Sequence, residues 1–471
     1  MIELIRNKLV VTALGIALVY GSVSLGLRIS STPDAGLTFL LALVPAVICV
    51  WIILKDNTDR TFLMRVFALA ISLRWALALI IDWKHLQPFF GPDAQTFDEV
   101  GMSIANAWKG LIPSGSSWLT GYTGYGRSGW GMFYYVGSVY YLVGRDQLLV
   151  QLINCALGAA SCITVYKIAQ LLYPEVRVAR TAAFLAAVSP SMILWSSQMM
   201  KDGPIVLSLS LCTLYTLKLQ AKFGVKNLLL LLLSLFLLFS LRNYAFYIMF
   251  AAVALALVLA GKRFTPLRFI QGGVLVIVIG GSLAYLGASD VPKDAFNLKK
   301  IQAARAWAAR ASNSGFGGDV DITDPEAALG FLPVGLVYVL FAPFPWMMTN
   351  LRQLITLPEM IVWWLLVPMV VKGFWYAVRH RLKESFAIVI FTVGLTLVYA
   401  LYQSNVGTAY RHRAQLYVFF FIFISIGLDL RRKAKLEKRS RMVFGRSGFA
   451  PLQAPAAPAA MARGTIDPRM S

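Results

Sequence analysis

Long apolar segments alternate with short polar ones along most of the chain. A helix of about 17–25 apolar residues spans the hydrocarbon core of a bilayer, so we interpret each such segment as a membrane span. The pattern predicts an all-α polytopic membrane protein of about 12 transmembrane helices. The expected spans are Leu9–Leu27, Leu37–Leu54, Phe62–Trp83, Leu148–Leu172, Ala182–Ser197, Pro204–Leu219, Leu228–Leu241, Tyr244–Leu259, Ile270–Leu286, Met360–Val378, Phe386–Tyr402 and Leu416–Leu430.

Two further apolar segments do not fit a simple crossing. Met132–Gly144 is short and rich in tyrosine, which favours a helix lying in the membrane interface. Phe331–Trp346 contains Pro333, Pro343 and Pro345, and proline interrupts a helix. A full crossing there would place the basic cluster after the last span outside, so we interpret this segment as re-entrant or interfacial.

Basic residues indicate the orientation of the spans. Most of them lie in short clusters between apolar segments, which is typical of cytoplasmic loops and makes both termini cytoplasmic. Two long loops then face the other side: a large outer loop at 84–147 that carries interfacial helices, and a second loop at about 287–358. The chain divides into two N-terminal transmembrane helices (1–61), a core (62–260), a C-terminal transmembrane part (261–439) and a disordered cytoplasmic tail (440–471).

Composition excludes a soluble fold. Hydrophobic residues make up 58% of the 471 residues, mean hydropathy is +0.67, and 14% of residues are charged, against about 25% in soluble globular proteins. The net charge of +22 would suit a nucleic-acid-binding protein. The basic residues are spread over separate clusters between spans, however, so we expect no nucleic-acid partner. The cysteines Cys155, Cys162 and Cys212 lie inside apolar runs and show no metal-binding spacing.

The first outer loop concentrates carboxylates directly after a predicted span. Asp93, Asp98 and Glu99 follow Pro92, and a helix that starts after this proline would place Asp93 in its first turn, where the helix dipole favours a negative charge. The simplest interpretation is a capped, solvated helix at the interface. The functional interpretation is a catalytic general base or an anchor for a divalent cation, with Asp98 and Glu99 as substrate-binding residues.

Charged residues also occur at other predicted outer turns. Lys201 and Asp202 lie between two apolar spans, where a charge is costly unless a partner satisfies it. Arginine side chains suit phosphate and pyrophosphate groups, although contact with lipid headgroups would explain the same residues. The substrate-binding candidates of this kind are Arg242, Arg411, His412 and Arg413.

These motifs, in this order, resemble the start of the membrane-embedded GT-C glycosyltransferases, whose members include the protein O-mannosyltransferases and the bacterial lipid A aminoarabinose transferase. The resemblance covers roughly residues 62–260. It rests on Pro-Asp-Ala-x-x-Phe at 92–97, Ile104–Gly110, a helix ending in Leu-Val-Gly-Arg at 142–145, Leu-Ile-Asn at 152–154, and Ser189–Ser197 leading to Lys201-Asp202.

The resemblance implies a GT-C-like fold and transfer of a sugar from a polyprenyl-phosphate carrier to an acceptor on the non-cytoplasmic face. It implies that Asp93 acts as general base or organises the site, that Asp202 is a second catalytic acidic residue, and that Lys201 meets the carrier phosphate. The chain departs from many relatives in carrying Phe97 in place of tyrosine, and it lacks an adjacent Asp-Glu pair at position 93. The one cofactor that the residues suggest is a divalent cation, bound by the acidic loop.

Two other functions fit parts of the pattern. A lipid-linked polysaccharide polymerase or glycan ligase would use the same external arginines with a pyrophosphate-linked donor. A membrane transporter would hold its ionisable groups near the bilayer midplane and show an internal repeat, which the sequence does not display.

The sequence also lacks Walker A, GxSxG, HExxH and dinucleotide-binding motifs, which argues against the use of bound ATP. We therefore expect a glycosyltransferase of cell-envelope or exopolysaccharide assembly in a bacterial inner membrane, with its active site facing the periplasm. Its expected partners are a polyprenyl-phosphate-linked sugar donor, a glycan, lipid or protein acceptor, and membrane lipids.

Overall fold

The computed structural model describes residues 35–55, 59–113, 115–124, 128–259, 297–312, 314–348 and 351–446 of the chain. These ranges contain seventeen α-helices, one short 3-10 helix and no β-strand, apart from an isolated bridge between Gly315 and Asn405. The all-α prediction is confirmed. The predicted spans Leu9–Leu27 and Ile270–Leu286 lie outside the described residues.

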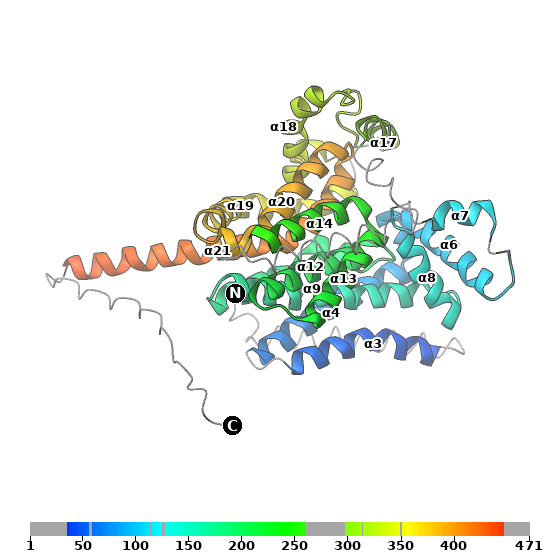
Figure 1. Cartoon of the computed structure of the whole chain (residues 1–471), viewed down its shortest axis with the longest axis horizontal. Coiled ribbons are helices and arrows are strands. Elements are labelled where there is room, and N and C mark those ends of the chain that lie inside the picture. The colour runs from blue at the N-terminus through cyan, green and yellow to red at the C-terminus, as the bar shows by residue number, and fades with distance from the viewer. Residues whose placement is uncertain are drawn as a thin grey trace. The chain divides into compact units, whose positions relative to one another are not determined.

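The helices follow one another with short connections over most of the described chain (Figure 1). They are α3 (Ala35–Leu54), α4 (Arg60–Trp83), α5 (Gln87–Phe90), α6 (Asp93–Trp108), α7 (Ser117–Thr123), α8 (Trp130–Val143), α9 (Gln147–Leu172), α10 (Val176–Val188), α11 (Pro190–Ser196), α12 (Asp202–Ala221), α13 (Val225–Leu241), α14 (Asn243–Leu259), α17 (Leu298–Arg310), α18 (Pro325–Phe341), the 3-10 helix η1 (Pro345–Met347), α19 (Leu351–His380), α20 (Leu382–Tyr402) and α21 (Val406–Arg446).

Six of these helices, α4, α9, α12, α19, α20 and α21, are long and apolar enough to cross a membrane. The bent pair of α10 and α11 makes a seventh candidate, and α3, α13, α14 and α18 are apolar but shorter. Each predicted span within the described ranges therefore corresponds to a helix or to the bent pair. The chain is an all-α polytopic membrane protein, and the total of about 12 spans stays a prediction.

Helix α9 forms the centre of the bundle and packs against α3, α4, α10 and α12. Its N-terminus is capped by Asp146, whose side chain accepts a hydrogen bond from the backbone N–H of Leu149 at 3.2 Å. Most of α9 is buried, and Gly158 lies so close to Ser196 that a Cβ at this position would clash. This close approach packs the end of α11 against the central helix, because Ser196 is the last residue of α11.

The predicted span Ala182–Ser197 is a bent pair of helices and not one straight helix. Helix α10 ends at Val188 and α11 begins at Pro190, and the two axes differ by 55°. The bend exposes carbonyl groups at the end of α10. Arg74 of α4 satisfies them, since its Nη1 and Nη2 donate to the carbonyl oxygens of Ala187 and Ala186 at 3.2 Å each.

The segment Phe331–Trp346 also departs from the prediction. Helix α18 continues through Pro333, so the interruption expected there is wrong, and the helix ends at Phe341, ahead of Pro343. Proline removes a single hydrogen bond from the helix, and α18 keeps its course because it packs closely along α20. The re-entrant or interfacial placement of this segment stays a prediction.

The outer loop predicted at 84–147 contains its expected helices. Helix α8 corresponds to the segment Met132–Gly144, and α6 begins at Asp93, as the position of Pro92 predicts. Helices α6 and α8 touch through Gly101 and Gly137, where any Cβ would meet the other helix within 3 Å. Asp93 is thereby carried on a helix that is packed against its neighbour along its length.

A second unit of the chain begins at Leu428, and its described part is the end of α21. Within it, Lys433 and Asp429 form an ion pair of 3.1 Å across one helical turn. Helix α21 runs to Arg446, so the first residues of the tail predicted at 440–471 are helical. Residues 447–471 lie outside the described ranges.

Candidate active site

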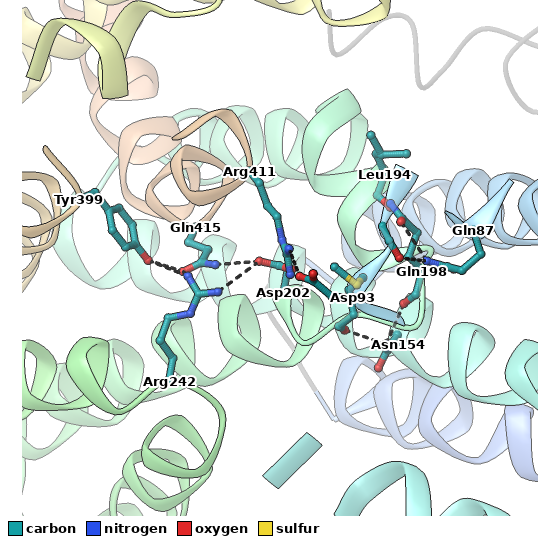
Figure 2. A network of polar contacts seen from close by, with 12 residues as sticks. Gln87, Asp93, Asn154, Leu194, Gln198, Asp202, Arg242, Tyr399, Arg411 and Gln415 are labelled. Atoms are coloured by element: carbon teal, nitrogen blue, oxygen red, sulfur yellow. Dashed lines mark hydrogen bonds and ion pairs between the residues drawn. The ribbon is translucent and has the colours of Figure 1, made fainter. Parts of the chain in front are cut away.

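Charged side chains from distant segments meet at one end of the helices around α12 (Figure 2). Asp93 comes from the first turn of α6, Asp202 from the first turn of α12, Arg242 from the turn between α13 and α14, and Arg411 from the second turn of α21. Each position lies at or near the end of an apolar helix, where a charge can avoid the hydrocarbon core. The structure thus brings together residues that the sequence suggested separately.

Arg411 joins the two aspartates. Its Nη1 lies 2.9 Å from Oδ2 of Asp93, while its Nε and Nη2 lie 2.8 and 2.6 Å from Oδ2 of Asp202. The guanidinium group also lies over the ring of Trp195, 5.5 Å from its centroid. One planar cation therefore fixes the distance between the two carboxylates, as the several N–H donors of arginine allow.

Asp202 has further partners from two other helices. Its Oδ1 accepts a hydrogen bond from Gln415 Nε2 at 2.8 Å and lies 3.9 Å from Nη2 of Arg242. Arg242 in turn donates to Gln415 Oε1 at 3.2 Å and to the hydroxyl of Tyr399 at 3.3 Å. Both oxygens of Asp202 are thus occupied, so this carboxylate is held as part of the framework.

The two aspartates differ most in their exposure. The side chain of Asp93 is 59% exposed, whereas that of Asp202 is 2% exposed. Arg411 contacts Oδ2 of Asp93. The other carboxylate oxygen, Oδ1, has no hydrogen bond to any part of the chain that the structure describes. Asp93 can therefore receive a proton from an incoming group, and Asp202 cannot be reached in this arrangement.

Lys201 directly precedes Asp202, and among the described residues it has no hydrogen-bond or ion-pair partner. Burial, followed by the nearby guanidinium groups of Arg242 and Arg411, lowers the pKa of Lys201 to about 7. Its Nζ would lie 2.8 Å from a Cβ at Gly129, whose φ of 96° already favours glycine. The ammonium group therefore remains available to an anion.

His412 and Arg413 follow Arg411 in the sequence but make other contacts. The ring of His412 stacks on Tyr399 at 4.8 Å, and its Nδ1 lies 2.6 Å from Nε2 of Gln403. Arg413 donates to the carbonyl oxygen of Leu340 at 2.7 Å at the C-terminal end of α18. His412 supports the framework next to the site, and Arg413 caps a neighbouring helix.

Asp98 and Glu99 also lie apart from the cluster. Asp98 is bound by Arg145, and its Oδ1 accepts a hydrogen bond from the Tyr140 hydroxyl at 2.6 Å. Burial alone would raise the pKa of Asp98, but the hydrogen bonds from Arg145 and Tyr140 outweigh it, and the pKa lies below its usual value. Glu99 is exposed and accepts a hydrogen bond from Gln95 at 2.9 Å.

Sequence reasoning missed Gln415 and Tyr399, which connect Arg242 to Asp202. Both are neutral, and both lie in strongly apolar helices. An isolated amide within a membrane span indicates a polar contact with another segment, because a polar group there requires a partner. Gln415 could have been selected on that ground, whereas its partners are visible only in the fold.

The described residues contain no group of three or more His, Cys, Asp or Glu side chains that could hold a metal ion. The four free cysteines Cys49, Cys155, Cys162 and Cys212 are buried and separate. Asp93 and Asp202 share Arg411, so in this arrangement they do not fit a divalent cation, and we derive no step through one. The divalent cation stays an untested prediction.

Comparison with known proteins supports the resemblance drawn from the motifs. Residues 130–284 match the family described as dolichyl-phosphate-mannose-protein mannosyltransferase, which is a GT-C superfamily family. This stretch contains Lys201, Asp202 and Arg242, and Asp93 and Arg411 lie outside it. A search of curated proteins gave no match. Over residues 130–284 the chain is thus similar to a GT-C mannosyltransferase family, which supports a glycosyltransferase function.

Proposed function

We propose that the protein transfers a sugar from a polyprenyl-phosphate carrier to an acceptor at the non-cytoplasmic face of the membrane. The observation that carries this proposal is an exposed carboxylate, Asp93, held by Arg411 beside an unpaired Lys201. A phosphate-linked sugar donor needs cations for its phosphate, and a hydroxyl acceptor needs a base. The site offers both within one cluster.

Asp93 acts as the general base in this mechanism. Its Oδ1 takes the proton from the acceptor hydroxyl while the acceptor oxygen forms a bond to the anomeric carbon of the sugar. The bond between that carbon and the carrier phosphate breaks, and its electron pair leaves with the phosphate. Attack opposite the leaving group inverts the configuration at the anomeric carbon.

The cations stabilise the leaving phosphate. Arg242 and Arg411 provide two positive charges against the two carboxylates of the cluster, and Lys201 adds a third when it is protonated. Negative charge develops on the carrier phosphate as the glycosidic bond breaks, so fixed cations lower the energy of the transition state. Asp202 acts by orienting Arg411 and Arg242 and takes no part in proton transfer.

The distribution of basic residues supports an active site on the non-cytoplasmic face. Helix α12 begins at Asp202 in the site and ends near Lys218, and α13 begins next to Lys226 and ends at Arg242 in the site. Lysines at the far ends of the same helices favour the cytoplasmic side there. In a bacterial inner membrane the site would face the periplasm, and the acceptor would belong to cell-envelope or exopolysaccharide glycans.

The test uses the purified protein in lipid with a panel of radiolabelled polyprenyl-phosphate sugars, mannose included. The acceptors come from membranes of source cells that lack this gene. We expect wild-type transfer, and an Asp93→Asn rate lower by about 10²–10⁴-fold, the usual contribution of a general base. Asp319→Asn, the same change at an exposed carboxylate of the second outer loop, is the matched control and should transfer normally.

The alternative functions give different results in this assay. Retained turnover by Asp93→Asn would remove the proposed role of this residue. Cleavage of pyrophosphate-linked oligosaccharides in place of monophosphate donors would indicate a polymerase or ligase. Movement of intact substrate into vesicles without chemical change would indicate a transporter.

A further inference from the structure

A network of buried amide side chains lies beside the charged cluster and connects the two segments that carry its aspartates (Figure 2). It consists of Gln87 on α5, Gln151 and Asn154 on α9, and Gln198 in the linker between α11 and α12. These four side chains are at most 9% exposed. Most buried amide groups form hydrogen bonds within the protein, and these contacts restrict the backbone around them.

Gln87 makes four hydrogen bonds in this network. Its Nε2 donates to the carbonyl oxygen of Gly91 and to Oε1 of Gln198, both at 3.2 Å. Its Oε1 accepts from Nε2 of Gln151 at 3.0 Å and from the backbone N–H of Met199 at 3.4 Å. The amide therefore uses both donors and accepts twice.

The contact to Gly91 fixes the start of α6. The carbonyl oxygen of Gly91 also accepts the first hydrogen bond of this helix, from the backbone N–H of Ala94 at 3.1 Å. Asp93 lies between these two residues, in the first turn. Gln87 thus holds the turn that carries Asp93 against the segment that leads to Lys201.

The two segments touch directly at Gly91. A Cβ there would lie 2.5 Å from Oε1 of Gln198, 3.1 Å from Nε2 of Gln87 and 3.2 Å from the sulfur of Met200. These distances leave no space for a larger residue without movement of the Gln198 amide. The spacing between the two segments is therefore set by close packing as well as by hydrogen bonds.

Asn154 holds the second segment independently of Gln87. Its Nδ2 donates to the carbonyl oxygens of Gln198 and Met200 at 2.9 and 3.0 Å. Met200 directly precedes Lys201, so this amide fixes the backbone from which the lysine and Asp202 project. The segment that carries Lys201 thus has its own anchor on the central helix α9.

We infer that Gln87 is the positioning residue for Asp93 and that Asn154 is the positioning residue for Lys201. The inference rests on the proposed function, in which Asp93 receives the acceptor proton and Lys201 binds the donor phosphate. Loss of the Gln87 contacts releases the base and leaves the cations in place. Loss of the Asn154 contacts displaces Lys201.

The test separates donor binding from turnover. Binding of polyprenyl phosphate is followed by isothermal titration, and transfer is measured with radiolabelled polyprenyl-phosphate mannose or the sugar found to be active. Gln87→Met should lower kcat by about tenfold or more, because small displacements of reacting groups are costly, and should leave Kd within about threefold. Asn154→Leu should raise Kd by about tenfold.

A matched control is available on the same helix as Asp202. Gln220 Nε2 donates to the carbonyl oxygen of Ala256 at 2.9 Å, far along α12 from the site. Gln220→Met removes an interhelical hydrogen bond of the same kind and should change neither kcat nor Kd. The binding stoichiometry counts the folded fraction of every variant, so a folding defect is distinguished from misplacement.

A second pair of variants tests the contact itself. Gly91→Ala should lower kcat by about tenfold through the clash with the Gln198 amide. Gly91→Ala combined with Gln198→Ala removes that clash and should be faster than Gly91→Ala alone. A double variant no faster than the single one would overturn the positioning role of this contact.

Failure of the inference differs from failure of the proposed function. If the wild-type protein transfers no sugar from any polyprenyl-phosphate donor, the proposed function falls, and the inference falls with it. If wild type is active and Gln87→Met keeps its kcat, or weakens Kd in parallel with kcat, the inference alone is overturned.

Discussion

Two buried aspartates, Asp98 on α6 and Asp202 on α12, are both held by arginine, yet they lie in very different surroundings. The side chain of each is 2% exposed. Asp98 pairs with Arg145, which is 51% exposed and has solvent on its other side. Asp202 pairs with Arg411 and Arg242, which are 13% and 3% exposed.

The comparison sets a balanced ion pair against a cluster with surplus charge. One positive and one negative charge balance at Asp98, and the Tyr140 hydroxyl completes the pair. Around Asp202 two arginines and Lys201 face two carboxylates, Lys201 has no hydrogen bond or ion pair within the described chain, and Asp93 is exposed. Surplus charge that is kept apart from solvent and left unpaired is typical of a functional site.

The two regions should differ most in their effect on the transfer rate when Arg411 and Arg145 are each replaced by lysine. Arg411→Lys keeps the charge but cannot hold Asp93 and Asp202 together with a single ammonium group, so the transfer rate should fall by about 10²-fold, or about 2.7 kcal/mol. Arg145→Lys should keep nearly full activity. Transfer of labelled sugar by the purified variants measures both effects.

Folding is checked by thermal unfolding of each variant in lipid. An equal loss of activity in the two variants would mean that the Asp98 pair belongs to the working site, and the contrast between the regions would disappear. Retained activity in Arg411→Lys would show that the bridge between the two aspartates is dispensable.

The next effect concerns pH. Lys201, with a pKa lowered to about 7, is charged below that pH and neutral above it, and a phosphodiester donor keeps its charge over the same range. Donor Kd should therefore increase by up to about tenfold per pH unit above pH 7. Lys201→Arg, which stays charged, should remove this dependence. The same slope in Lys201→Arg would assign the titration to another group.

A smaller effect is expected at Asp98, and it concerns the stability of the protein and not the transfer rate. Asp98→Asn removes the charge that Arg145 binds, and because that arginine is half exposed the cost should be about 1–2 kcal/mol. Since the pKa of Asp98 is lowered, its stabilisation is present above about pH 4, the unfolded value, and is lost as pH falls through the folded value. Thermal unfolding between about pH 3 and pH 7 measures it. A variant as stable as wild type at neutral pH would contradict the structural role.

The sequence predicted most helices because length and apolar composition are local properties of a membrane span. The prediction of helix geometry failed where contacts from another helix determine the course of the backbone. The bend at Pro190 depends on Arg74 of α4, which binds the carbonyl groups that the bend exposes. Likewise, α18 passes through Pro333 while packing along α20, and no local pattern reveals that support.

The residues of the candidate site were also predicted only in part. Charge at the ends of apolar segments indicated Asp93, Asp202 and Arg411, and the fold brings them together. The same criterion selected Asp98 as well, because sequence spacing does not show that the turn after α8 supplies Arg145 to neutralise it. Neutral residues such as Gln415 escaped the criterion altogether.

The smallest effect is expected at Glu99, which lies in the same acidic segment as Asp93. Six residues along α6 place the two carboxylates about 120° apart around the helix and about 9 Å apart along it. Glu99 is exposed and contacts Gln95, so Glu99→Gln should change kcat by less than about threefold. Transfer rates of Glu99→Gln and Asp93→Asn, measured side by side, decide between the two carboxylates. An equal loss in both variants would mean that the acceptor approaches the exposed face of α6, and the base would then lie outside the Arg411 cluster.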